Sequence, residues 1–264
     1  MSVAPALSAR GLAVGYEGRA VVAGIDLMLP RGAMISLVGT NGSGKSTLLK
    51  TAVGVLRPCS GSIDVLGRAP GDRSTRVGYL SQFHSGSILL PLRAADIVMM
   101  GRYPGKGLLG RLDSGDRARV REAMERLEIG HLAGEPLREL SGGQQQRVYI
   151  AQVLAQRADL IVLDEPAAGL DAAGGQLLLG VLDEERARGA AIVMATHDIG
   201  EAVRADLVML LAGRVVGLGK PQEVLTSQAL LDTFGLAIRQ IDGVLTMDPG
   251  HRHGPHDPAH PGHE

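Results

Sequence analysis

The sequence has little of what marks a secreted, membrane-spanning or nucleic-acid-binding protein. Its one cysteine, Cys59, excludes an internal disulfide framework, and its first residues lack the basic stretch, apolar run and cleavage site of a signal peptide. Apolar runs such as 207–212 are far shorter than the roughly 20 residues that a membrane-spanning helix needs. The net charge is −1 and basic residues are interspersed with acidic ones, so we expect no nucleic acid partner. We therefore expect a cytosolic protein that needs a partner for any role at a membrane.

The chain has 264 residues, 45% of them hydrophobic, which is enough for one large α/β domain or two modest ones. Short β-rich stretches, several followed by helix-like segments, indicate a buried parallel sheet. They lie at residues 33–39, 77–81, 160–164, 191–196 and 207–211. Between about 85 and 155, apolar residues such as Val120, Met124 and Leu127 recur at helical spacing, which indicates a helical insertion. The absence of a repeat at a fixed period argues against a solenoid or a propeller.

A glycine-rich loop follows the strand predicted at 33–39. It consists of Gly39, Thr40, Asn41, Gly42, Ser43, Gly44, Lys45, Ser46 and Thr47, and fits the pattern G-x-x-x-x-G-K-[ST]. Glycines let several backbone N–H groups converge on phosphate oxygens, and the following helix adds its positive end. We expect Lys45 to neutralise the β and γ phosphates and the Ser46 hydroxyl to ligate Mg²⁺. The alternative is a turn that carries a lysine by chance, but the preceding strand and the downstream motifs favour a site for ATP and Mg²⁺.

Polar residues also end two of the later predicted strands. The run 160–165 is typical of a buried strand and ends in two adjacent carboxylates, Asp164 and Glu165, at the edge where open α/β sheets place their sites. We expect Asp164 to hold Mg²⁺ through water and Glu165 to polarise the attacking water as a general base. A plain solvated strand end is the alternative. His197 follows the strand at 191–196 and is within possible reach of the γ-phosphate or the water, although a lone histidine there is more often structural.

A second sequence suited to anions lies near the end of the helical insertion. It consists of Leu140, Ser141, Gly142, Gly143, Gln144, Gln145, Gln146 and Arg147. Ser141 can cap a helix there, and the glycines expose backbone N–H groups. The chain therefore has two helix ends suited to phosphate. The residue types alone do not indicate what the second end faces.

Together these motifs resemble the ABC ATPase family, over roughly residues 8–235. The resemblance implies an α/β fold with a P-loop NTPase core, a mainly parallel sheet, an N-terminal antiparallel β part and a helical subdomain insertion. It implies one ATPase domain over residues 1–240, with the helical subdomain at about 85–155. Residues 241–264 would then form a His-rich tail, which we expect to be disordered.

The resemblance also assigns roles in ATP binding and hydrolysis. Tyr16 would stack on adenine, although a tyrosine in a glycine-bounded loop is also an ordinary surface residue. Gln82 would sense the γ-phosphate, contact Mg²⁺ and link the core to the helical subdomain, and His197 would be the switch residue. Two chains would hold two ATP molecules between them, head to tail, with residues 169–171 bridging the sites. The contacts to the other copy's nucleotide would come from Ser141, Gly142, Gly143 and Gln144.

A single cassette without a membrane span or a long coiled-coil insertion disfavours fused exporters, tandem translation-type ATPases and chromosome-maintenance ATPases. Residues 88–102 are similar to the segment that grips the permease in metal, siderophore and haem importers, and residues 166–171 to the zinc and manganese branch. We therefore expect a peripheral ATPase on the cytoplasmic side of the cell membrane. It would energise manganese or zinc import through separate permease subunits, and act indirectly with a substrate-binding protein. The alternatives are a siderophore, haem or cobalamin importer, an exporter or lipid-handling cassette, and an ABC ATPase outside transport.

Histidines crowd the last fourteen residues among prolines, glycines and acidic residues. They are His251, His253, His256, His260 and His263. Neutral imidazoles bind Zn²⁺, Ni²⁺ or Cu²⁺ well and Mn²⁺ less tightly. Our hypothesis is that the tail buffers or senses the transported metal. The alternative is a solvated tail, because the irregular spacing defines no coordination geometry.

Overall fold

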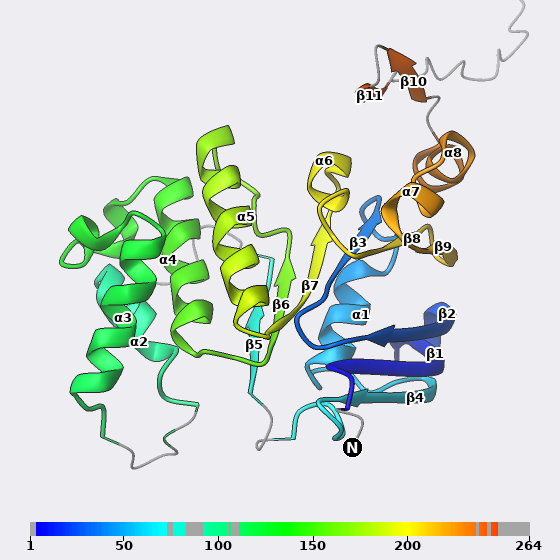
Figure 1. Cartoon of the computed structure of the whole chain (residues 1–264). Helices are drawn as coiled ribbons and strands as arrows, with labels where there is room; N and C mark the ends of the chain where they lie inside the picture. Colours follow the sequence, from blue (N-terminus) through cyan, green and yellow to red (C-terminus); the bar gives the residue numbers. More distant parts are fainter. Residues whose placement is uncertain are drawn as a thin grey trace, which may run out of the picture.

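The computed structural model describes residues 4–72, 76–82, 92–104, 106, 111–235, 238–241 and 244–247. Its centre is a six-stranded mixed sheet, with an antiparallel sheet on one side and a group of helices on the other (Figure 1). Within the described residues, no helix is both long and apolar enough to cross a membrane. The arrangement is the α/β fold that the motifs predict.

The central sheet has the strand order β5-β6-β7-β3-β8-β9, and all neighbours in it are parallel except β8 and β9. Its strands are β3 (Met34–Gly39), β5 (Val77–Leu80), β6 (Leu160–Asp164), β7 (Ala191–Thr196), β8 (Leu207–Leu211) and β9 (Val215–Gly219). Every residue of β3, β6 and β7 is buried, because helices and the second sheet cover both faces. The five strands predicted from the apolar runs are confirmed, to within one residue at each end.

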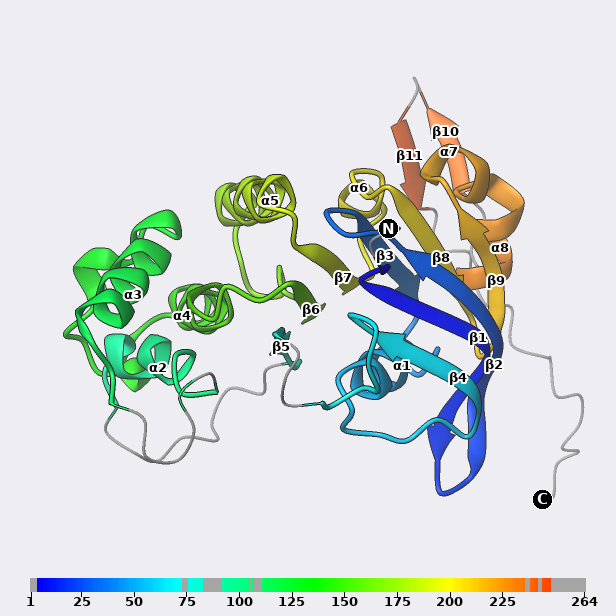
Figure 2. The same ribbon diagram turned by 60° about the horizontal axis from the view of Figure 1, so that its bottom comes forward.

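A three-stranded antiparallel sheet, in the order β2-β1-β4, forms the N-terminal part of the molecule (Figure 2). Its strands are β1 (Leu7–Tyr16), β2 (Arg19–Leu29) and β4 (Ser60–Val65). Helix α1 (Lys45–Ala52) contacts β1 on one side and β3, β6 and β7 on the other. Its buried Leu48 and Leu49 share one hydrophobic core with both sheets. This packing fixes the start of α1 at the end of β3.

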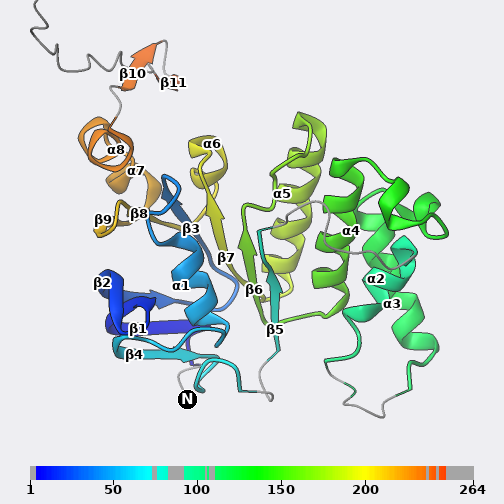
Figure 3. The same ribbon diagram turned by 180° about the vertical axis from the view of Figure 1, so that it is seen from behind.

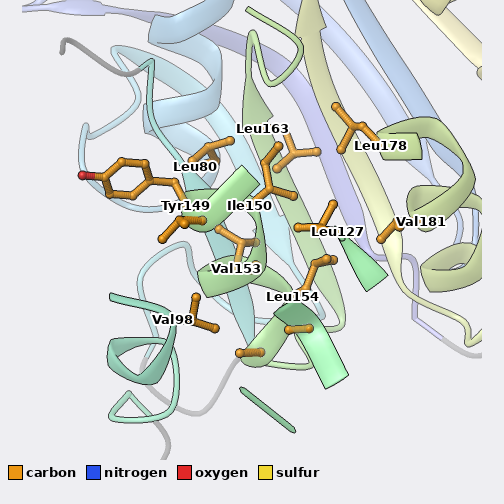
Figure 4. Packing of buried hydrophobic residues seen from close by; sticks show 14 of the residues in the cluster. Leu80, Val98, Leu127, Tyr149, Ile150, Val153, Leu154, Leu163, Leu178 and Val181 are labelled. Carbon is orange, nitrogen blue, oxygen red and sulfur yellow. The ribbon is translucent and has the colours of Figure 1, made fainter. Parts of the chain in front are cut away.

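Three helices form the predicted helical insertion and lie together beside the sheet (Figure 3). They are α2 (Ala94–Met100), α3 (Ser114–Arg126) and α4 (Gly142–Ala155), with short 3₁₀ helices at Gly130–Leu132 and Leu137–Glu139. Leu127 and Leu154 from this region pack with Leu163 of β6 and with Leu178 and Val181 of α5 (Ala172–Ala187) in one core (Figure 4). The helical insertion is therefore joined to the sheet through a continuous apolar contact.

The C-terminal part follows β7 with α6 (Ile199–Ala202), α7 (Pro221–Val224) and α8 (Ser227–Phe234). An antiparallel pair, β10 (Ile238–Ile241) and β11 (Val244–Met247), comes next. Strand β11 lies inside the segment that we expected to be a disordered tail from residue 241, so strand structure extends to Met247. The five tail histidines lie outside the described residues.

Candidate functional site

The glycine-rich loop lies between β3 and α1 and borders a cavity of about 380 Å³. The cavity is lined by Tyr16, Val21, Thr40, Asn41, Gly42, Ser43, Gly44, Lys45, Ser46, Thr47, Gln82 and Glu165. The carboxyl ends of β3, β5 and β6 meet at one edge of the central sheet, and the separate antiparallel sheet adds Tyr16 from β1 and Val21 from β2. The fold therefore collects most of the residues expected at a nucleotide site into one hollow.

The loop owes its shape to glycines at two close approaches. Gly44 has a φ of 105°, and a side chain there would lie 2.3 Å from Val22 Cγ2. At Gly39, a side chain would meet the carbonyl oxygen of Leu211 at 2.2 Å. Gly44 is also the N-cap of α1 and offers no side chain to the first N–H groups of that helix. The first turn of α1 lines the cavity and has no side-chain cap, which suits phosphate binding.

Lys45 is held against the loop, with only 5% of its side chain exposed. Its Nζ donates to the carbonyl oxygens of Gly39 (2.7 Å) and Thr40 (3.1 Å), and lies 3.9 Å from Glu165 Oε1. Burial lowers the pKa of Lys45, although the carboxylates of Glu165 and Asp164 act in the opposite direction. The ammonium group is therefore positioned beside the cavity, with its charge only partly compensated.

Asp164 and Ser46 are the candidate protein ligands of Mg²⁺. Asp164 is buried at the end of β6, and its Oδ1 has no hydrogen-bond partner in the described part of the chain. Burial raises the pKa of Asp164, while a hydrogen bond from the Ser46 side chain lowers it. Mg²⁺ in nucleotide sites takes one or two protein oxygens and completes its shell with water and phosphate. The Ser46 hydroxyl and the buried Asp164 carboxylate therefore fit that ion.

The Glu165 carboxylate is where the predicted site residues meet. In addition to its approach to Lys45, its Oε2 accepts a hydrogen bond from Gln82 Nε2 (3.4 Å) and lies 3.9 Å from His197 Nδ1. Glu165 also has a φ of 50°, in the left-handed region that residues other than glycine rarely occupy. The backbone is held there because the Glu165 N–H donates to the carbonyl of Ala195. Such outliers recur where a side chain must be aimed at a reacting group.

Sequence reasoning missed the residues that support the His197 loop. The Thr196 hydroxyl donates to Glu201 Oε2 at 2.6 Å and accepts from the Asp198 N–H at 3.0 Å. Burial raises the pKa of Glu201, and the Thr196 hydrogen bond partly opposes this. These contacts fix the turn between β7 and α6, while the His197 side chain remains largely exposed. An N-capping Asp198 followed by a glutamate in the first turn was the available signal.

Tyr16 and Val21 line the same cavity from the antiparallel sheet. Tyr16 is the last residue of β1, and its side chain is 47% exposed. An exposed ring at the rim offers a flat face to a base, as expected for adenine stacking. Val21, on β2, was missed because an apolar strand residue carries no signal of this kind.

The second anion-type helix start borders a different cavity, of about 460 Å³. It is lined by Glu128, Ile129, His131, Leu132, Ser141, Gly143, Gln144, Arg147, Gly169, Leu170 and Asp171. Ser141 Oγ accepts from the Gln144 N–H (3.3 Å), and Gln144 Oε1 accepts from the Ser141 N–H (2.9 Å). Gly142 is the first residue of α4. Within one chain, these residues are thus not part of the cavity that holds Lys45 and Glu165.

The two cavities are mechanically connected. Gln146 Nε2 on α4 donates to the carbonyl oxygen of Pro166 at 2.8 Å, immediately after Glu165. Arg147 lies 3.8 Å from a Glu128 carboxylate oxygen and 3.7 Å from one of Asp171. A hydrogen bond from α4 therefore joins the helix to the segment that follows Glu165.

The sequence and the fold are similar to those of known proteins. The sequence profile of the ABC transporter family matches residues 22–168. The manganese transport system ATP-binding protein MntB of Bacillus subtilis is 37% identical over 223 residues, which cover 84% of this chain and 89% of that protein. The hemin import ATP-binding protein HmuV of Streptomyces coelicolor is 40% identical over 234 residues, with 86% and 82% covered.

A solved structure extends the likeness to the fold. It is described as a metal-chelate type ABC transporter in an inward-facing conformation. It superposes with a TM-score of 0.77 at 29% identity and covers 92% of this chain and 96% of that one. The loop, the buried strand ends and the second helix start thus occur in the expected order on the expected fold. The chain belongs to the ABC transporter family and is an ATPase cassette of that family.

Proposed function

We propose that ATP binds in the cavity of the glycine-rich loop and is hydrolysed there with Glu165 as the general base. The observation that carries this is the position of the Glu165 carboxylate, which borders the cavity and lies within 4 Å of Lys45, Gln82 and His197. The loop N–H groups and Lys45 would bind the phosphates, Tyr16 would stack on adenine, and Gln82 and His197 would contact the γ-phosphate end.

Ser46 and Asp164 would hold Mg²⁺, with Gln82 reaching the ion from the segment that follows β5. The ion would supply charge neutralisation on the phosphates. Glu165 would take a proton from the water that attacks the γ-phosphorus, because its carboxylate lines the cavity. Gln82 and His197, which both lie near Glu165 Oε2, would keep that carboxylate oriented.

A second copy of the chain would complete the site. Ser141, Gly142, Gly143 and Gln144 lie at a cavity separate from the glycine-rich loop, so one chain cannot place both on one nucleotide without a rearrangement. In a head-to-tail dimer, each of these helix starts would face the nucleotide of the other copy. Residues 169–171, which line the same cavity, would lie between the two sites.

ATP hydrolysis would power the import of manganese or zinc through separate permease subunits. The ATPase would bind these subunits at the cytoplasmic face of the membrane. The manganese relative and the resemblance of residues 166–171 to the zinc and manganese branch favour this. A haem, siderophore or cobalamin importer is the second candidate, favoured by the 40% identity to the hemin import protein. For permease contact, the described part of residues 88–102 offers α2 with the exposed Met100, and Tyr103 is exposed beside it.

The test is to reconstitute this chain with its permease in liposomes, together with the substrate-binding protein, and to measure ATP hydrolysis. Candidate substrates are Mn²⁺, Zn²⁺, haem and a ferric hydroxamate. Stimulation by Mn²⁺ or Zn²⁺ supports the metal importer and ranks the ions. Stimulation only by haem or the chelate moves the protein to the second candidate. Liposomes with a Glu165→Gln chain control for hydrolysis by contaminants.

The histidine-rich tail would add metal sensing to this function. A variant that ends at Met247 keeps every described residue and removes all five tail histidines. We expect its ATPase and uptake to lose part of their dependence on metal concentration while maximal hydrolysis is unchanged. An identical metal dependence in the shortened and full chains would remove the tail from the function.

A further inference from the structure

Tyr79 lies on β5, three residues before Gln82, and takes no part in the site as described so far. Its hydroxyl is fully buried and has no hydrogen-bond partner in the described part of the chain. A buried polar group without a partner is costly, so such groups usually have a water, an ion or a function. The buried Asp164 Oδ1 is in the same condition.

The sheet register places both groups on one face. Tyr79 pairs with Val162 on the neighbouring strand β6, and Asp164 is two residues further along that strand. Side chains alternate along a strand, so Val162 and Asp164 point to the same face as Tyr79, where α1 covers the sheet. The backbone positions of Tyr79 and Asp164 are therefore offset by one strand spacing of ~4.8 Å across the sheet and by two residues of ~3.3 Å each along it. A tyrosine side chain is long enough to extend over most of that offset.

The electrostatics agree with this placement. Burial raises the pKa of Tyr79 to about 12, and the Asp164 carboxylate is the next cause of that rise. The phenol therefore keeps its proton at any working pH and is a permanent donor. Ser46 already hydrogen-bonds the Asp164 carboxylate, but Oδ1 is left over. One buried water between the two orphaned atoms would satisfy both, as buried waters commonly do.

We propose that Tyr79 is a positioning residue for the Mg²⁺ site: its hydroxyl donates, through one buried water, to Asp164 Oδ1 and fixes the orientation of that carboxylate. The inference rests on the proposed function, because it assumes that Asp164 serves Mg²⁺. Groups that orient a metal-binding side chain in this way typically change metal affinity by about 10- to 100-fold when removed. The hydroxyl does not border the cavity, so Tyr79 acts through Asp164 and not on the nucleotide itself.

The experiment compares Tyr79→Phe, which removes only the hydroxyl, with wild type and with Tyr149→Phe. Tyr149 is a buried tyrosine on α4 that packs in the core shared with the helical insertion (Figure 4), whereas Tyr79 packs in the core beneath α1. The readout is the melting temperature at a fixed concentration of a non-hydrolysable ATP analogue, titrated with Mg²⁺. We expect Tyr79→Phe to need about tenfold more Mg²⁺ for half of the stabilisation. Its melting temperature without ligand should not fall, because the lost hydroxyl had no direct partner.

The Asp164→Asn background shows whether Tyr79 acts through Asp164. There, adding Tyr79→Phe should change the Mg²⁺ dependence no further. An unchanged Mg²⁺ midpoint in Tyr79→Phe overturns the inference, as does a fall in melting temperature without a shift in that midpoint, which would indicate packing alone. A wild-type chain with no Mg²⁺-dependent stabilisation by nucleotide would instead overturn the proposed function. The two failures are therefore distinguishable.

Discussion

Helices α1 and α4 both start beside glycines and each borders a cavity at its N-terminus, yet the two helix starts differ in how their first N–H groups are satisfied. At α1, Gly44 offers no cap, and the adjacent Lys45 is buried with its charge partly uncompensated. At α4, Ser141 and Gln144 cap each other's N–H groups. The first end therefore has its donors free for a ligand, whereas the second has already satisfied two of its own.

The charged residues near the starts of α1 and α4 also differ, and they too leave the first cavity more available to a ligand. Burial disfavours the ionised forms of both Lys45 and Asp164, so the first cavity holds groups that a bound phosphate and cation would stabilise. Arg147, the basic residue of the second cavity, is instead flanked by Glu128 and Asp171. The comparison indicates that the start of α1 has groups available for a ligand within one chain. At the start of α4, a ligand would first have to replace the internal hydrogen bonds and ion pairs of that cavity.

The largest effect is expected for the base of the first cavity. Glu165→Gln keeps the size and most contacts of the side chain but cannot accept a proton, so we expect the turnover of ATP to fall about 100-fold or more while binding persists. Glu128→Gln makes the same chemical change in the second cavity and should alter turnover less than about twofold. Steady-state hydrolysis and equilibrium binding of ATP measure the two quantities. A Glu165→Gln chain with wild-type turnover would refute the assignment of the base.

The next effect concerns the buried cation beside α1. Lys45→Ala removes the ammonium group that lies at the cavity, so the dissociation constant for ATP should rise about 30-fold or more. Lys220→Ala, which removes an exposed lysine outside both cavities, is the matched control and should leave affinity unchanged. Titration with a fluorescent ATP analogue gives the constants. Equal affinity in Lys45→Ala and wild type would mean that this helix end is no more prepared for phosphate than the other.

A smaller effect is expected at the capped end. Ser141→Ala removes the N-cap of α4, which costs about 1 kcal/mol and should lower the melting temperature by about 2–4 °C. Its affinity for ATP as an isolated chain should not change, because Ser141 lies outside the first cavity. Asp113→Ala removes the equivalent cap of α3 and should lower the melting temperature similarly. Only Ser141→Ala should also reduce hydrolysis by the dimer; equal hydrolysis in both variants would leave α4 with a structural role.

The smallest effect concerns the free-energy cost of burying the ionised Asp164 carboxylate in the nucleotide-free protein. The pKa of Asp164 is raised by burial above its ordinary 3.8, so the folded chain is penalised as the pH rises above that value. Asp164→Asn should therefore raise the melting temperature of the nucleotide-free protein by about 1–2 °C at pH 7. The gain should shrink as the pH is lowered towards 4, which calorimetry at several pH values would follow. If Asp164→Asn melted at a lower temperature than wild type at pH 7, burial of the ionised Asp164 would not destabilise the nucleotide-free protein.

The parts of the site that lie consecutively in the chain could be predicted from the sequence. The loop from Gly39 to Thr47 needs only a strand before it and a helix after it, and both follow from local apolar patterning. The order of the motifs along the chain indicated the ABC ATPase family, and that resemblance implied the α/β fold with a mainly parallel sheet. Ser141 as an N-cap could be predicted for the same reason, because a capping box spans only four residues.

The parts that depend on strand order could not be predicted from local patterns. Gln82 contacts Glu165 across 83 positions of sequence, because β5 and β6 are neighbours in the sheet. Periodicity predicts a strand but not the strand beside it, so this contact came only through the family resemblance. Tyr79 and Val21 gave no signal, since a tyrosine and a valine in strands are ordinary core residues. The strand pair β10 and β11 was missed although it had a local signal, since Asp242 and Gly243 between two β-type runs are typical of a two-residue hairpin turn.

Strand β3, which leads into the nucleotide loop, has β7 and β8 as its two neighbours in the sheet. The ribosome synthesises β7 and β8 more than 150 residues after β3, because β3 ends at Gly39 and β7 begins at Ala191. During synthesis the loop therefore emerges long before the strands that support it, and contacts of such long range also slow folding. A nascent chain stalled at residue 190 would contain the complete glycine-rich loop and bind no nucleotide. The cell thus receives a working ATPase only after most of the chain has left the ribosome.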